Sequence, residues 1–288
     1  MAISAQDVKS LRDRTGAGMA DCKKALEEAN GDMDGAIEVL RKRGAATAAK
    51  RADKAANEGV IATAISADRS RAAMVEVNCE TDFVARNEEF STFTRNLAEY
   101  VLNNNPDSMD ELMAGEIEGK SVQTWLSELL GKFSERIEIK RFDVVKTDGG
   151  FVADYVHNGD KLGVLVEFSG SGDSEKVASV ARDIAMQVAA MNPSYVHRDE
   201  VTETTLEKER EIYRQLAINE GKKPEFADKI IAGRLEKYFA DSCLMEQTFV
   251  KDSSKMIRDI LADFSKDLGS DVNVVRFIRF NLGEQAGK

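Results

Sequence analysis

The apolar residues of the first fifty positions recur at the three- and four-residue spacing of amphipathic helices. Ser4 can cap the first helix, and Gly16, Gly31 and Gly44 stand where three successive helices would end. The pattern therefore predicts a small three-helix module, followed by an Ala-rich helical arm over Ala45–Ala56. The apolar faces of the three helices are Val8 and Leu11; Cys22, Ala25, Leu26 and Ala29; Met33, Ala36, Ile37 and Leu40.

Two later segments alternate apolar and polar residues with the period of two that is typical of β-hairpins. The first hairpin joins Val60–Ala67 to Arg71–Cys79, and the second joins Phe151–His157 to Leu162–Phe168. The pattern predicts an α+β fold with a duplicated β-β-α-α-β body. After each hairpin come amphipathic helices and one further strand, either Ile137–Val145 or Val272–Phe280.

Local matches between the two halves support the duplication. Met74–Val77 matches Leu165–Phe168, and Leu129–Ser134 matches Ile260–Ser265. The second pair is further apart along the chain than the first, so the second half contains an insertion, which we place at residues 192–252. Its two amphipathic segments predict a helical hairpin, which must bury its apolar stripe on itself, on the body or on another chain. It is therefore also a candidate contact for a homodimer.

The length of 288 residues, 42% of them hydrophobic, is enough for more than one core. We expect the module and its arm over residues 1–55, a first core subdomain over 56–147 and a second over 148–288, interrupted by the insertion at 192–252.

Charge is distributed unevenly. The net charge of −11 at pH 7 disfavours direct nucleic-acid binding through phosphate contacts. Residues 1–55 differ, with 11 Lys+Arg against 9 Asp+Glu, and most of this basic excess lies between Arg41 and Lys54. A solvated helical linker explains the excess, and an electrostatic contact with an acidic partner is the alternative.

The cysteines and the absence of membrane signals indicate a reduced, cytoplasmic location. Cys22, Cys79 and Cys243 are far apart, odd in number and without CxxC spacing, which disfavours a disulfide framework. The sequence has no apolar run of membrane-spanning length and no secretory signal at its amino terminus. We expect no contact with membranes.

Recognisable catalytic motifs are absent from the sequence. It has no GxxxxGK[ST] loop, no GxGxxG after a strand and no GxSxG. His157 and His197 do not stand at a metal-binding spacing. We therefore expect a protein that is not an enzyme and holds no cofactor or metal of its own.

The most informative segment is Asn78–Asn87, which follows a predicted strand and leads into a helix. Thr81 is placed to cap that helix, and Asp82 to interact favourably with its positive end. In a purely structural interpretation Phe83 is the first core residue of the helix. In a functional interpretation it is an exposed contact at the corner.

Two long motifs carry a resemblance to a known family. Asn78-Cys79-Glu80-Thr81-Asp82-Phe83-Val84-Ala85 resembles a signature of bacterial translation elongation factor Ts, and Leu11–Leu26 resembles that family's amino-terminal signature. The resemblance covers nearly the whole chain. It implies that residues 1–55 are a ubiquitin-associated-like three-helix module, that the body is the family's pair of core subdomains, and that the hairpin is its coiled-coil insertion.

The resemblance implies guanine-nucleotide exchange on elongation factor Tu during protein biosynthesis. In that case Asp82 and Phe83 would enter the GTPase domain of the partner near its bound Mg²⁺ and disturb that site. Thr81 and Val84 would flank them.

Further implied contacts lie outside this motif. Arg12 and Met19 would contact the same partner domain, and His157 would lie toward another one. The sequence departs from the family pattern at Ala20, where some relatives carry methionine, and after Phe280, where a carboxy-terminal helix of some members is not expected.

Two other classes of function remain open from the residues alone. A three-helix module could serve a generic adaptor for ubiquitin-like or nascent-chain partners. A metabolic enzyme would need a pocket with perturbed titrating groups.

Overall fold

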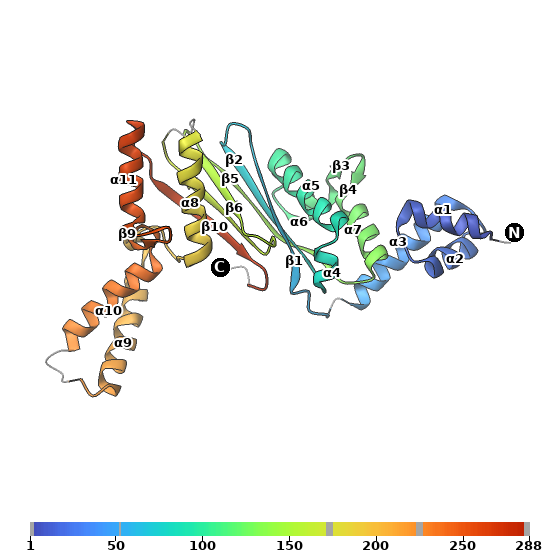
Figure 1. The fold of residues 1–288 in the computed structure, drawn as a ribbon. Coiled ribbons are helices and arrows are strands. Elements are labelled where there is room, and N and C mark those ends of the chain that lie inside the picture. Colours follow the sequence, from blue (N-terminus) through green and yellow to red (C-terminus); the bar gives the residue numbers. More distant parts are fainter. Residues whose placement is uncertain (1–2, 52, 171–174, 223–226, 285–288) are drawn as a thin grey trace.

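The computed structural model describes residues 3–51, 53–170, 175–222 and 227–284, and it confirms the mixture of helices and strands expected from the sequence (Figure 1). Helices α1 (Ala5–Thr15), α2 (Met19–Glu28) and α3 (Met33–Lys50) form the amino-terminal end. At the start of α1 the Ser4 side chain accepts a hydrogen bond from the Asp7 backbone, and the Asp7 side chain accepts one from the Ser4 backbone. The three helices share a small buried cluster: Val8, Leu11, Ala17, Cys22, Ala25, Leu26, Ala36 and Leu40.

The prediction that Gly44 ends the third helix was wrong, because α3 continues without a break to Lys50. Gly44 instead lies where α3 crosses α7 (Val122–Phe133). A Cβ atom at Gly44 would stand 2.8 Å from the Ser127 carbonyl oxygen and 3.0 Å from the Gly131 Cα. The glycine therefore permits close approach of two helix backbones rather than a change of direction.

Replacing a glycine within a helix by alanine usually stabilises a protein. At Gly44 the contact with α7 predicts the opposite, a loss of stability. Gly44→Ala is expected to lower the free energy of unfolding by about 1–3 kcal/mol, because the new methyl group meets backbone atoms that cannot give way. Gly233→Ala is the matched control, since its added Cβ meets nothing within 4 Å in α10 (Ala227–Ser242). It is expected to raise stability by about 0.5–1 kcal/mol. Urea unfolding of both variants checks this, and a stabilised Gly44→Ala variant would contradict it.

The first sheet has the strand order β1-β2-β5, with both pairs antiparallel. Helices α5 (Glu88–Asn104) and α7 supply the apolar side chains that cover one of its faces. The sequence did not predict the short helix α6 (Met109–Ala114) or the small hairpin of β3 (Glu116–Ile117) and β4 (Lys120–Ser121). The strands of the sheet are Glu58–Ile65, Arg71–Cys79 and Ile137–Lys146.

The second sheet repeats this plan, with the strand order β6-β7-β10. One of its faces is covered by α8 (Glu175–Met191) and α11 (Ile257–Leu268), which correspond in order to α5 and α7. Both sheets thus place the second strand of the hairpin at the centre and pair the last strand with it. The strands are Phe151–Val156, Leu162–Phe168 and Val274–Asn281.

The two sheets pack face to face, so the body has four layers with helices on both outer sides (Figure 1). Ile61 and Met74 of the first sheet meet Leu165 and Phe280 of the second in a separate buried cluster. At Gly163 an added Cβ would lie 2.6 Å from the Ile61 Cγ2, so the sheets approach closely there.

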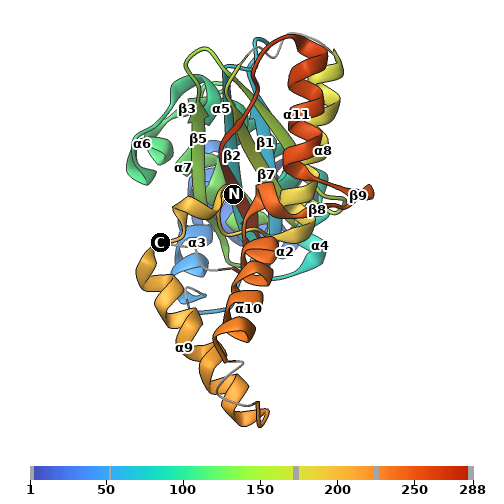
Figure 2. The ribbon, with the colours of Figure 1, turned by 90° about the vertical axis from the view of Figure 1, so that its left-hand side faces the viewer.

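The insertion leaves the body between α8 and α11. Its helices α9 (Glu203–Asn219) and α10 pack on each other and project away from the sheets, as Figure 2 shows. At the base, Arg198 binds Glu236 of α10 at 3.1 Å and Glu246 at 2.5 Å. The sequence predicts the joint between the two helices at residues 221–224, of which 223 and 224 lie outside the described residues. The remaining short strands are β8 (Thr248–Phe249) and β9 (Asp252–Met256).

Candidate functional site

Phe83 lies at the corner between β2 and the one-turn helix α4 (Asp82–Ala85), and 83% of its surface is exposed. No other large apolar side chain in the described part of the chain reaches this exposure. The structural interpretation of Phe83 as a core residue is therefore wrong. The ring is therefore accessible to another molecule in the free protein.

The corner beneath Phe83 is held rigidly. Thr81 donates from its hydroxyl to Glu135 at 2.7 Å and from its backbone nitrogen at 3.1 Å. Thr81 occupies the position expected for an N-cap, but its side chain makes no capping hydrogen bond, because Glu135 engages it instead. The buried Cys79 thiol donates to the Thr81 carbonyl at 3.2 Å, and Val84 is only 5% exposed. Thr81 and Val84 thus anchor the corner and present little surface.

Asp82 stands beside Phe83 with 42% of its side chain exposed and binds Arg86 at 3.2 Å. Asp82 and Arg86 line a hollow of about 270 Å³, whose opposite wall is the turn Gly159–Lys161 of the second hairpin. The carbonyl of Asp160 accepts from the Ile61 backbone at 2.7 Å, which ties that turn to β1. The structure therefore brings the corner of the first half next to a turn of the second.

Glu80 connects the corner to the segment that arrives from the amino-terminal helices. Its carboxylate accepts two hydrogen bonds from the Arg51 guanidinium, at 2.6 and 2.7 Å, and one from the Arg136 backbone at 2.6 Å. The pair with Arg51 lowers the pKa of Glu80 from its ordinary value of 4.5 to about 2. Sequence reasoning missed this role, because the partners are distant along the chain.

A lowered pKa makes the stability contribution of Glu80 dependent on pH. The contribution is complete above about pH 4.5 and is lost as the pH falls toward 2, since the carboxylate must then take up a proton in the folded state. Glu80→Gln is expected to be less stable than the wild type at pH 7, with a difference that shrinks steadily below pH 4.5. Urea unfolding at pH 7, 5 and 3.5 measures this difference. A difference that stays constant over the series would contradict the assignment.

The other residues implied by the resemblance lie apart from this corner. Arg12 is exposed on α1, and Met19 is 45% exposed at the start of α2. His157 is exposed just after β6, where its Nδ1 lies 2.9 Å from the Tyr155 hydroxyl. The structure places Arg12 and Met19 on the amino-terminal helices and does not bring His157 to them.

The basic excess near α3 is largely paired within the chain. Arg41 donates to Thr124 at 2.7 Å, Arg43 binds Glu28 at 2.8 Å and Lys42 binds Glu38 at 2.8 Å. These pairs support the interpretation of a solvated helical linker over that of a free electrostatic contact.

Burial raises the pKa of the Cys79 thiol to about 12 and that of Cys243 to about 11, so neither is poised as a thiolate at neutral pH. Among the described residues, no group of three or more His, Cys, Asp or Glu side chains is arranged to hold a metal ion. In the same described part of the chain, no helix is both long and apolar enough to span a membrane.

The stacked sheets define a class: a duplicated α+β protein that displays an exposed aromatic side chain, Phe83, at a strand-to-helix corner of its first half. Comparison with known proteins gives the family. The family model "Elongation factor TS" matches residues 80–284. The chain is 46% identical over 283 residues to "Elongation factor Ts" of Clostridium perfringens (strain SM101 / Type A), covering 98% of this chain and 93% of the relative. It is also 48% identical over 285 residues to that of Chlorobaculum tepidum, covering 98% and 99%. The chain belongs to the elongation factor Ts family.

Proposed function

We propose that this protein is a guanine-nucleotide exchange factor that binds elongation factor Tu in its GDP form and promotes GDP release in the cytoplasm during translation elongation. The observation that carries the proposal is Phe83, 83% exposed on a corner fixed by Thr81 and Glu135. Membership of the elongation factor Ts family supports it. No covalent chemistry is involved, since exchange needs only differential binding of two states.

In this proposal Asp82 and Phe83 form a wedge, which acts next to the groups that contribute most of the free energy of nucleotide binding. Nanomolar binding corresponds to about −12 kcal/mol. Much of it comes from Mg²⁺ and from backbone NH groups around the phosphates. A rigid aromatic ring can separate packed elements next to that site, and Asp82 adds a charge at the same point. The proposed effect on Mg²⁺ is therefore indirect, through displacement of the elements that hold it.

Other surfaces supply binding energy without touching the nucleotide. We assign Arg12 and Met19 to the same domain of elongation factor Tu as the wedge, and His157 to a different one. Their exposure supports these roles. In this proposal residues 1–55 are the amino-terminal module with its arm, 56–147 the first core subdomain and 148–288 the second, interrupted by the insertion at 192–252.

The direct test is the release of fluorescent GDP from elongation factor Tu, followed by stopped flow with increasing amounts of this protein. The rate is expected to rise and then saturate, and the protein alone is expected to bind neither GDP nor GTP. By linkage, GDP must weaken the complex by the same factor that the protein weakens GDP binding. A GDP release rate that does not change with the added protein would overturn the proposal.

The helical hairpin has a separate role in this proposal, as a contact for a second copy of the chain. Its helix α9 exposes Ile212, Leu216 and Ile218. Within the insertion predicted at 192–252, Val196, Leu244 and Phe249 belong to the core of the second half. Replacing only residues 203–241 by a short linker is therefore expected to retain most of the stimulated GDP release and to abolish any dimer. Sedimentation and the release assay test both points. A folded variant without activity would show that the hairpin belongs to the exchange machinery.

A further inference from the structure

A lysine from the body reaches across to the amino-terminal helices. Lys132 belongs to the last turn of α7, and its side chain lies directly on the backbone of Gly16, between α1 and α2. A Cβ atom at Gly16 would stand 2.6 Å from the Lys132 Cε and 2.8 Å from its Nζ. Lys132 thus occupies the space that any other residue at position 16 would need.

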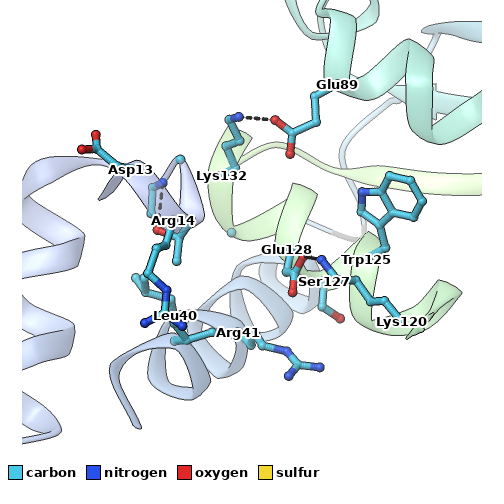
Figure 3. A pocket seen from close by; sticks show the side chains of 15 residues that line it. Asp13, Arg14, Leu40, Arg41, Glu89, Lys120, Trp125, Ser127, Glu128 and Lys132 are labelled. Atoms are coloured by element: carbon cyan, nitrogen blue, oxygen red, sulfur yellow. Dashed lines mark hydrogen bonds and ion pairs between the residues drawn. The ribbon is translucent and has the colours of Figure 1, made fainter. Parts of the chain in front are cut away.

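The same lysine is fixed from the other side. Its ammonium group forms an ion pair with Glu89 in the first turn of α5, as Figure 3 shows. The two side chains are 26% and 43% exposed. Glu89 follows the short helix that carries Phe83, and Gly16 precedes Met19 closely in sequence. Lys132 therefore touches both segments that carry proposed partner contacts.

The amino-terminal helices also contact α7 through α3. These contacts include Gly44 and Arg41, which donates to Thr124 at 2.7 Å. A cleft of about 470 Å³ opens between α7 and the end of α1, and Lys132 and Gly16 both line it. Contacts along one helix leave a rotation about that helix open. Lys132 adds a contact away from α3, between α7 and the turn that joins α1 to α2.

From this geometry we infer that Lys132 is a positioning residue, which fixes the Arg12–Met19 surface relative to the Asp82–Phe83 corner so that both meet one partner together. The inference rests on the proposed exchange function. A partly exposed ion pair adds little to folding stability. Two surfaces held at the correct separation, by contrast, bind more tightly than either alone, and the gain is lost when the geometry varies.

The test separates binding from the maximal rate in the GDP release assay. Lys132→Met keeps the aliphatic stem and removes the charge, and Glu89→Gln breaks the pair from the other side. Each is expected to raise the half-saturating concentration of the protein about tenfold and to leave the maximal rate unchanged, because the wedge itself is intact. Lys132→Arg is expected to restore most of the affinity. In a Met19→Ala background the effect of Lys132→Met should be much smaller, since the surface it positions is already impaired.

Lys120→Met is the matched control, because Lys120 lines the same cleft but pairs with Glu128 within the body. It is expected to behave as the wild type. An unchanged half-saturating concentration for Lys132→Met, an equal rise for Lys120→Met, or a fall in the maximal rate alone would overturn the inference. If the wild-type protein does not accelerate GDP release at all, the proposed function itself fails, which is a distinguishable result.

Discussion

Phe83→Ala is expected to reduce the stimulated release of GDP from elongation factor Tu by about 30-fold or more. An aromatic residue at the centre of an interface is commonly worth about 2 kcal/mol or more, and each 1.4 kcal/mol is tenfold in rate. The free energy of unfolding is expected to change by less than about 0.5 kcal/mol, because 83% of the ring is exposed in the free protein. A core phenylalanine would instead cost about 3–5 kcal/mol. Stopped-flow release of fluorescent GDP and urea unfolding measure the two quantities.

Ile218→Ala provides a matched control for the loss of an exposed apolar side chain. Ile218 is 61% exposed, and it lies on α9 of the projecting hairpin. Its replacement is expected to leave GDP release unchanged. A destabilised but fully active Phe83→Ala variant would show that the ring has a structural role only.

The proposed effect of Asp82 and Phe83 on Mg²⁺ can be tested separately, by removing the ion from elongation factor Tu. If the wedge acts partly by loosening the ion, removing Mg²⁺ from elongation factor Tu with EDTA makes that part redundant. The difference in stimulated rate between the wild type and the Asp82→Ala, Phe83→Ala double variant should then narrow. An undiminished difference without Mg²⁺ would mean that these residues act by another route.

The sequence predicted the strands of the body well, because each is a short run rich in apolar residues, and turn residues separate the two strands of each hairpin. The predicted strand Arg71–Cys79 coincides with β2. The error at Gly44 has a physical cause. A glycine that ends a helix and one that admits a neighbouring helix look alike locally, and the deciding contact with Gly131 lies far away along the chain. The two-residue strands β3 and β4 are too short to show any period.

In the candidate site, too, the features with a local sequence signal were predictable and those set by contacts distant along the chain were not. Local pattern placed Phe83 at a strand-to-helix corner, where the structure has it, but could not decide whether the ring was buried. The supports of the corner were not predictable, since Glu135 lies 54 positions from Thr81 and Lys132 lies 43 from Glu89. Charged residues are abundant in the sequence, so pairing between distant ones leaves no local signal.

The junction of the two sheets supplies the largest expected effect on stability. Glu76 of β2 is 1% exposed and binds Arg141 of β5 at 2.6 Å, on the face that meets the second sheet. The Arg141 guanidinium also lies 4.1 Å from the centre of the Phe280 ring and donates to the Asn281 carbonyl at 3.4 Å. One ion pair thus joins two strands of the first sheet to the last strand of the second.

Glu76→Ala is expected to lower the free energy of unfolding by about 3–5 kcal/mol, because it leaves the mostly buried Arg141 charge without its partner. The duplication provides a control: Glu167 of β7 binds Arg276 of β10 at 2.7 Å, but Arg276 is 50% exposed. Glu167→Ala should therefore cost no more than about 1 kcal/mol. Replacing both buried partners, as in Glu76→Met with Arg141→Leu, should recover most of the loss, since no unpaired charge then remains. Urea unfolding of the four proteins measures these differences, and equal costs at Glu76 and Glu167 would show that burial between the sheets does not govern the pair.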